Sequence, residues 1–296
     1  MSESKIRSLR RKTLKEGWIA LAFLLPAIAA LIIFRVFPFL SSTYNSFFST
    51  SISNTTPIFS GFENYISLLK SSQFLNSLKV TILFLLIVNP FQILIALFLS
   101  VVLTQRIVGG KLLRTIIFLP VAVPPAVTAL VWGLALRPDG IFNTIIKSLG
   151  LSSQPFLTSP DQALFCIIVI LSWAGIGYWM VFLIAGLKEI PNSLLEAAVI
   201  DGATWWTCFV KIIIPMMRKT LAFVLVANTI ANFTIFAHIQ VLTKGGPSGS
   251  TDLIMYQIYR QVFQYGNANL GAAATTILML VILSIVIIEY RILNKE

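Results

Sequence analysis

The sequence contains few charged residues, which make up 11% of its 296 residues. A soluble globular domain carries about twice that fraction. Apolar residues make up 57%, and apolar runs of about 20 residues, the length that spans a bilayer as a helix, recur along the whole chain. The scarcity of charge therefore excludes an ordinary soluble domain and predicts an all-α, polytopic membrane protein.

Histidine, cysteine and acidic residues are also scarce, with one His, two Cys and 11 Asp or Glu. Cys166 and Cys208 have no metal-ligand spacing, and we expect neither to form a disulfide. Glu196 and Asp201 have no histidine or nucleophile beside them, and the lone His238 is more typical of a structural, hydrogen-bonded residue. A glycine-rich run in the last third of the chain lacks the lysine of a phosphate-binding loop. The sequence thus predicts a protein that is not an enzyme and that binds no metal or cofactor itself.

Lysine and arginine outnumber the acidic residues and give a formal charge of +11. Most of them flank apolar segments on one side of the membrane, as the positive-inside rule describes. The charge is therefore explained by membrane orientation and predicts no nucleic-acid partner. Residues 1–17 are predicted to be a basic cytoplasmic N-terminal segment and residues 290–296 a cytoplasmic tail.

Six apolar segments predict six transmembrane helices in one domain, residues 18–289. Prolines in the second and third segments predict local bends. Polar stretches at 41–76, at 137–161 and after the fifth segment are predicted to be exterior loops. In order, the predicted spans are residues 18–37, 80–103, 115–136, 164–187, 221–242 and 270–288.

The middles of these spans carry polar neutral residues rather than carboxylates. Ion-coupled carriers usually need intramembrane carboxylates, because a charge in lipid is costly and is retained for function. This pattern disfavours the alternative function, an ion-coupled secondary transporter acting alone.

Polar and small residues follow helical spacing on two of the spans. Asn228 and Asn232 share one face of the fifth span, and Gly175 and Tyr178 share one face of the fourth. Amides beside an aromatic ring suit a neutral, hydroxyl-rich solute. The same asparagines are equally typical of contacts that join membrane helices. The residues alone leave both interpretations open.

The segment 191–215 combines acidic, basic, small and aromatic residues between two spans. Ser193 and Glu196 fit an S-x-x-E capping box, which predicts a short helix. Gly202 can end that helix in a left-handed conformation, and Thr204 can cap a second helical piece. This segment is predicted to be cytoplasmic and rigid.

Several separated positions in this segment match one known pattern. Glu196-Ala197-Ala198, followed by Gly202 six positions after the glutamate and by Pro215, resembles the EAA loop of ABC-importer inner-membrane permeases. Ile214 stands where that pattern has leucine. Gly61-Phe62-Glu63-Asn64-Tyr65 and Lys244-Gly245-Gly246-Pro247 resemble segments of the carbohydrate-uptake type of these permeases.

The resemblance implies the type I ABC importer fold and a permease subunit for a sugar or related polyhydroxylated solute in a bacterial-type inner membrane. Its implied partners are a second homologous permease, two ATP-binding cassette subunits that carry ATP and Mg, an extracytoplasmic solute-binding protein, and membrane lipid. It also implies two sets of functional residues. The ATPase-coupling helix would use Glu196, Ala197, Ala198, Asp201 and Gly202, and the solute cavity Gly175, Tyr178, Asn228 and Asn232.

Overall fold

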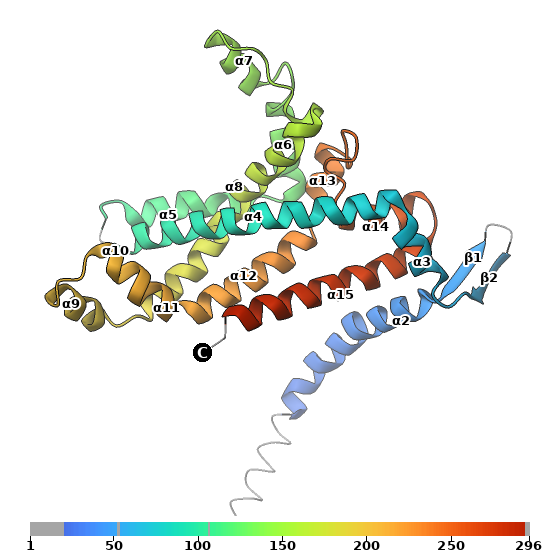
Figure 1. The fold of residues 1–296 in the computed structure, drawn as a ribbon, viewed down its shortest axis with the longest axis horizontal. Helices are drawn as coiled ribbons and strands as arrows, with labels where there is room; N and C mark the ends of the chain where they lie inside the picture. The colour runs from blue at the N-terminus through green and yellow to red at the C-terminus, as the bar shows by residue number, and fades with distance from the viewer. Residues whose placement is uncertain (1–20, 52–53, 106, 294–296) are drawn as a thin grey trace, which may run out of the picture.

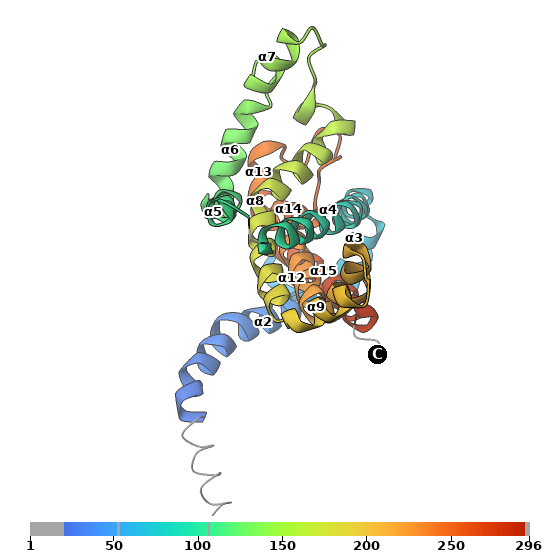
Figure 2. The same cartoon turned by 90° about the vertical axis from the view of Figure 1, so that its left-hand side faces the viewer.

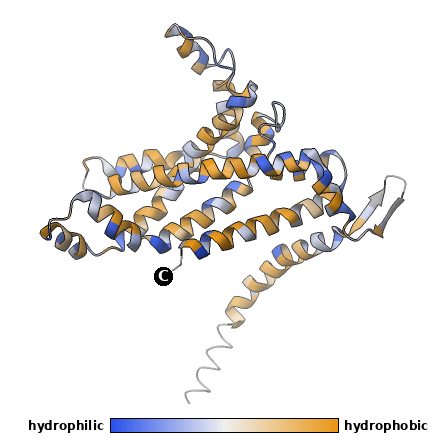
Figure 3. Cartoon of the chain, in the orientation of Figure 1, coloured by the Kyte–Doolittle hydropathy of each residue, from blue (hydrophilic) through white to orange (hydrophobic). Residues whose placement is uncertain are grey.

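The computed structural model describes residues 21–51, 54–105 and 107–293. The predicted basic segment 1–17 and the end of the predicted tail lie outside these residues. Five helices of the described chain are long and apolar enough to cross a membrane, and a sharply bent helix pair makes a possible sixth. Figure 3 shows that apolar residues predominate along these helices. The predicted all-α, polytopic architecture is confirmed.

Four long helices form the body of the molecule (Figure 1). At one end lie the C-terminal ends of α4, α8 and α15 together with the start of α12; the opposite end carries α3, α14 and a β-hairpin. The first helix, Leu21–Asn45, which ends in α2 (Phe37–Asn45), projects away from this body in both views (Figures 1 and 2). The bounds of the four helices are α4 Ser72–Thr104, α8 Pro160–Lys188, α12 Arg218–Phe233 and α15 Ala268–Leu293.

The third predicted span is broken rather than continuous. α5 (Gly110–Phe118) and the 3-10 turn η2 (Leu119–Ala122) meet α6 (Pro125–Ala135) at an angle of 96°. Proline lacks the backbone N–H that a helix interior requires, and it disfavours a helical residue before it. The prolines of this segment therefore account for the break, which is sharper than the local bend that the sequence predicted. Beyond it, α6 and α7 (Ile141–Ser148) project from the body (Figure 2).

The second and fifth spans differ from their predicted bounds. α4 is a single helix of 33 residues that passes through Pro90 and starts eight residues earlier than expected. Its first turn is capped by Ser71, whose hydroxyl accepts from the backbone N–H of Phe74 at 3.4 Å. The fifth span is interrupted after α12 and resumes as α13 (Ala237–Leu242).

The segments predicted as exterior loops contain regular structure. β1 (Phe48–Ser51) and β2 (Asn54–Phe59) form an antiparallel hairpin that is followed by α3 (Glu63–Lys70). The side chain of Asn64 donates to the carbonyls of Ser46 and Phe48, both at 2.8 Å, and ties α3 to the hairpin. α14 (Ile254–Tyr259) and the π-helical turn η5 (Arg260–Gln264) follow the fifth span. Hydrogen bonding and burial, which no local pattern reveals, thus order these loops.

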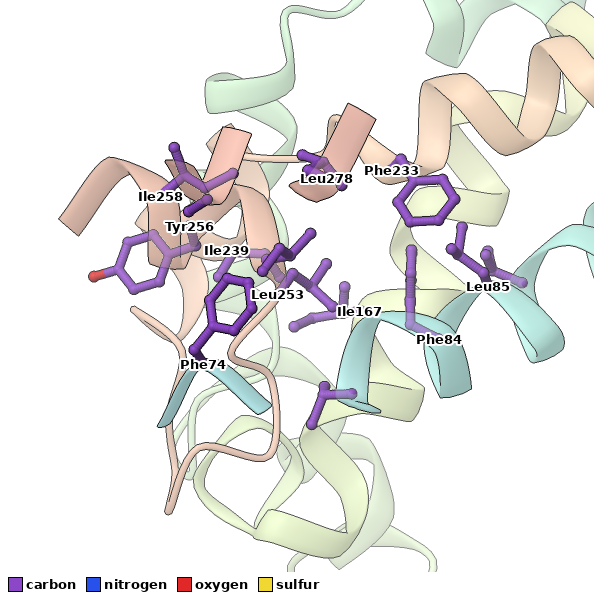
Figure 4. Close-up of a cluster of buried hydrophobic side chains, with 14 of the residues drawn as sticks. Phe74, Phe84, Leu85, Ile167, Phe233, Ile239, Leu253, Tyr256, Ile258 and Leu278 are labelled. Atoms are coloured by element: carbon purple, nitrogen blue, oxygen red, sulfur yellow. The ribbon is translucent and has the colours of Figure 1, made fainter. Parts of the chain in front are cut away.

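Two apolar clusters stabilise the body. The outer cluster, named for its place at the end that carries α3 and α14, includes Phe74 and Phe84 of α4 and Phe233 of α12, all almost fully buried (Figure 4). The inner cluster joins α4, α8 and α12 and includes Met180 and Met217, both with 0% exposure. Lipid tails are as apolar as these side chains, so close packing and hydrogen bonds, rather than removal from water, hold membrane helices together.

Candidate functional site: the loop between spans four and five and the adjoining groove

The segment between α8 and α12 folds as a helical corner. α9 (Asn192–Ile200) starts directly after Pro191 and has no side-chain cap, so the predicted Ser193–Glu196 capping box is wrong. The N-cap position is occupied by Pro191 with extended backbone, so Ser193 is already inside the helix and past the position from which a side chain caps it. Gly202 ends the helix with φ +79°, and the N–H of Ala203 donates to the carbonyl of Ala198 at 2.9 Å, as predicted for a left-handed glycine end.

The second half of the corner is α10 (Trp205–Cys208), the π-helical turn η4 (Phe209–Ile213) and α11 (Ile214–Met216). Thr204 caps α10 as predicted, because its hydroxyl accepts from the N–H of Thr207 at 3.2 Å. The side chains of Leu195, Phe209 and Ile213 pack against the inner cluster. The corner is therefore attached to the ends of both α8 and α12.

The predicted coupling residues lie on the surface of this corner. Ala198 is half-buried, whereas the other members of the set, namely Glu196, Ala197, Asp201 and Gly202, are exposed. Val199 and Ile200 beside them are 65% and 85% exposed, and Trp206 is 64% exposed. A group of large exposed apolar side chains at the end of a helical bundle is typical of a protein-contact surface.

An open groove of about 540 Å³ lies between α8 and α12. Gly175 and Tyr178 line it as predicted, together with Phe182 and Phe223. Ring centroids lie 5.1 Å apart for Tyr178 and Phe182 and 5.6 Å apart for Phe182 and Phe223. The lining includes no charged residue. The wall of the groove is thus a row of aromatic rings, a surface that suits the flat apolar faces of a ring-shaped solute.

Asn228 and Asn232 do not line this groove. They are 0% and 5% exposed and face α4, where Asn228 Nδ2 donates to Gln92 Oε1 at 2.6 Å and Asn232 Nδ2 donates to Asn89 Oδ1 at 2.8 Å. Weaker bonds of 3.2 Å join Asn232 to Gln92 and to Asn228. In this conformation both asparagines join α12 to α4. The residues of α12 that line the groove include Ala227 and Ala231 instead.

The back of the groove holds two N–H groups that sequence reasoning missed. A Cβ added to Gly175 would lie 3.8 Å from Gln92 Nε2 and 3.8 Å from Trp179 Nε1. Among the described residues, neither nitrogen donates a hydrogen bond to a protein atom. Because glycine has no side chain, an acceptor oxygen of a solute can approach both donors. The sequence signal that could have indicated these donors is Gln92, a glutamine in an otherwise apolar span close to Asn89-Pro90.

A carboxylate also lies closer to these amides than the sequence indicated. Glu289 is inside α15, one residue past the predicted end of the sixth span, and its Oε1 accepts from Thr229 Oγ1 at 2.8 Å. Thr229 in turn accepts from Asn89 Nδ2 at 2.8 Å. The expectation of neutral polar residues concerned the middles of the spans, and Glu289 lies beside the end of one of them.

A polar pocket of about 430 Å³ lies at the opposite end, outside the spans. It includes Lys244 and the ion pair of Arg260 with Asp252, the one ion pair among the described residues. Burial raises the pKa of the Asp252 carboxyl above its usual value, and the neighbouring Arg260 guanidinium opposes that rise.

These features define a transport subunit, a helical membrane body with a central groove and an exposed helical corner. Comparison with known proteins identifies its family. The family described as "Binding-protein-dependent transport system inner membrane component" matches residues 92–296. The chain belongs to this family, and it is a permease subunit of an ABC importer with the type I fold. The alternative of an ion-coupled secondary transporter acting alone has no support.

Individual relatives match along almost the whole chain. The sn-glycerol-3-phosphate transport system permease protein UgpA of Agrobacterium fabrum is 33% identical over 92% of this chain and 93% of the relative. A probable ABC transporter permease of Pyrococcus horikoshii is 34% identical over 90% and 92%. A chain of the bacterial alginate ABC transporter, solved in complex with an alginate pentasaccharide-bound periplasmic protein, matches with a TM-score of 0.79 and 27% identity over 96% of this chain and 98% of that one.

Proposed function

We propose that this permease carries a sugar or a related polyhydroxylated solute through the groove at Gly175 and Tyr178. The observation that carries the proposal is the combination of aromatic rings with two unpaired N–H donors behind Gly175. Rings support the apolar face of a sugar, and N–H groups bind its oxygen atoms. Relatives named for sn-glycerol 3-phosphate and for the polysaccharide alginate support this solute class.

In this proposal Asn228 and Asn232 complete the site when the helices rearrange. They lie directly behind the groove wall and hold α12 to α4 in the present conformation. A shift of α12 relative to α4 would free their amides for solute hydroxyls. The groove would then change from one side of the membrane to the other as the helices rock, which is the general mechanism of alternating access.

The proposed assembly contains a second homologous permease, two ATP-binding cassette subunits that bind ATP and Mg, and an extracytoplasmic solute-binding protein. Both termini would lie in the cytoplasm, on the side of the helical corner. The corner would contact an ATPase through Glu196, Ala197, Ala198, Asp201 and Gly202. Its attachment to both α8 and α12 supports this role, because a displacement of the corner moves both walls of the groove.

Reconstitution into liposomes tests the assignment of solute and energy source. Uptake of radiolabelled maltotriose, sn-glycerol 3-phosphate and alginate trisaccharide is measured with the permease alone and with the complete complex, with and without ATP. We expect uptake of at least one of them only with the complete complex and ATP. Uptake by the permease alone would contradict the proposal. A complex that hydrolyses ATP but takes up none of the three would contradict the solute class.

Two glycines with nearly the same backbone conformation, Gly202 and Gly150, allow a controlled test of the coupling role. Gly202 ends α9 with φ +79°, and Gly150 ends α7 with φ +75°; a Cβ added to either would meet nothing within 4 Å. The change to aspartate therefore imposes the same kind of local strain at the ends of two helices, α9 and α7, that lie far apart in the molecule (Figures 1 and 2). We expect Gly202→Asp to abolish solute-stimulated ATP hydrolysis with normal membrane insertion, and Gly150→Asp to retain it. Equal activity in the two variants would contradict the coupling role.

A further inference from the structure

A chain of side-chain hydrogen bonds runs from the groove to the sixth span. It starts behind Gly175 at Gln92, passes through Asn232 and Asn89, and reaches Glu289 by way of Thr229. The successive bonds are Asn232 to Gln92 at 3.2 Å, Asn232 to Asn89 at 2.8 Å, Asn89 to Thr229 at 2.8 Å and Thr229 to Glu289 at 2.8 Å. The chain thus connects three transmembrane helices, α4, α12 and α15.

An ionised Glu289 would determine the direction of every bond in this chain. An ionised carboxylate can only accept, so the single hydroxyl hydrogen of Thr229 must point to Glu289. Thr229 can then only accept from Asn89, which must present its Nδ2. The Oδ1 of Asn89 is consequently directed at Asn232, which must donate with its own Nδ2.

The same reasoning reaches the groove. Asn232 Nδ2 and Asn228 Nδ2 both donate to Gln92 Oε1, so Gln92 directs its carbonyl oxygen at α12 and keeps its Nε2 on the other side. That nitrogen lies 3.8 Å from the Cβ position of Gly175. A glutamine amide has an acceptor and a donor at its two ends, and one carboxylate decides which of them the groove receives.

We propose that Glu289 is a positioning residue that fixes the amide orientation of Gln92 and thereby presents an N–H donor to the solute groove. Without the charge, the amides and the hydroxyl can reverse together and keep every bond, since each amide can exchange its two ends. The groove would then receive the oxygen of Gln92. The inference rests on the proposed role of the groove in binding solute, but the orientation itself can be measured without any solute.

The test uses the complete complex in nanodiscs, with the permease labelled with ¹⁵N at glutamine side chains. A Gln92→Leu variant identifies the Gln92 signal by its loss. In the wild type we expect one Gln92 NH₂ signal that exchanges with groove water. Glu289→Gln keeps the shape of the side chain and removes its charge. In this variant we expect a second, exchange-protected signal that holds at least about a tenth of the population, which corresponds to a difference of about 1.3 kcal/mol or less between the two orientations.

Three further variants make the result decisive. Thr229→Val removes the hydroxyl that links Asn89 to Glu289, and it should also produce two Gln92 signals. The double variant should behave like either single one, since both act through one chain. Tyr290→Phe, at an exposed neighbouring position, should leave a single signal. An unchanged single Gln92 signal in both folded Glu289→Gln and Thr229→Val would overturn the proposal and leave the transport function untouched.

Discussion

Gly186 of α8 lies directly against Thr220 of α12. A Cβ added to Gly186 would be 2.6 Å from Thr220 Oγ1 and 2.7 Å from its Cγ2. The missing side chain thus brings the two helices into contact at the ends that carry the helical corner. Small residues of this kind allow membrane helices to approach closely.

The first prediction concerns this contact. Gly186→Ala should separate the two helices, because the added Cβ would lie within 2.9 Å of three side-chain atoms of Thr220, and should cost roughly 1–3 kcal/mol. Solute-stimulated ATP hydrolysis and thermal stability in detergent are the measurements. Thr220→Gly on the same background removes the opposing atoms and should restore much of the loss. No restoration would indicate that the two residues do not meet.

The second prediction compares two glycines of one helix. A Cβ on Gly177 would lie 2.4 Å from the carbonyl oxygen of Ile117, in the backbone of the broken third span, whereas Gly175 has only ordinary contacts at 3.8 Å. Gly177→Ala should therefore lower the thermal midpoint of the protein by several degrees, for a cost of roughly 1–3 kcal/mol. Gly175→Ala should leave the midpoint nearly unchanged. A larger residue, as in Gly175→Leu, should abolish uptake in a correctly inserted protein.

The third prediction concerns the second donor of the groove. Trp179→Phe keeps an aromatic ring and removes the Nε1 hydrogen. If that hydrogen binds solute, KM for uptake should rise about 2- to 12-fold, which corresponds to the net value of one hydrogen bond. Trp173→Phe is the control, because Trp173 packs against Trp132 at 5.5 Å and is absent from the groove lining. Equal KM values for both variants would exclude Trp179 from the solute site.

The fourth prediction concerns the ion pair of Arg260 with Asp252. Arg260→Met leaves the largely buried Asp252 without its cation and should destabilise the protein by roughly 3 kcal/mol, more than the double change Asp252→Leu with Arg260→Met. Burial raises the folded-state pKa of Asp252 above its unfolded value, so the protonated form is favoured on folding. Stability is therefore lost as pH rises through the folded pKa. The deficit of Arg260→Met should be smaller near about pH 4 than at about pH 7, as measured by thermal unfolding in detergent.

Much of this structure can be predicted from local patterns. The apolar runs locate the helices, the prolines locate the break in the third span, and Gly202 locates the end of α9. The shared face of Asn228 and Asn232 also follows from their spacing. Each of these features depends on residues within a few turns of one another.

Other features depend on distant residues and could not be predicted. Asn228 faces α4 rather than the groove because its partner Gln92, 136 residues away in the sequence, lies there. Glu289 joins the same network over 60 residues by its bond to Thr229. The helix α14 is ordered by burial, with Ile254 and Gln257 both at 0% exposure. Spacing identifies a face of a helix, but only the packing of the chain decides what that face meets.

Pro90 interrupts the backbone hydrogen bonding of α4 at one position. Its nitrogen carries no hydrogen, so the carbonyl of Leu86 lacks the usual partner one turn later. Asn89 precedes Pro90 and Gln92 follows it, so the two amides of α4 lie on opposite sides of this proline. A bend at this position would change the distance of Gln92 from α12 while Asn89 kept its bond to Thr229. Pro90 therefore stands between the end of the network that lies beside Gly175 and the end that lies beside the sixth span.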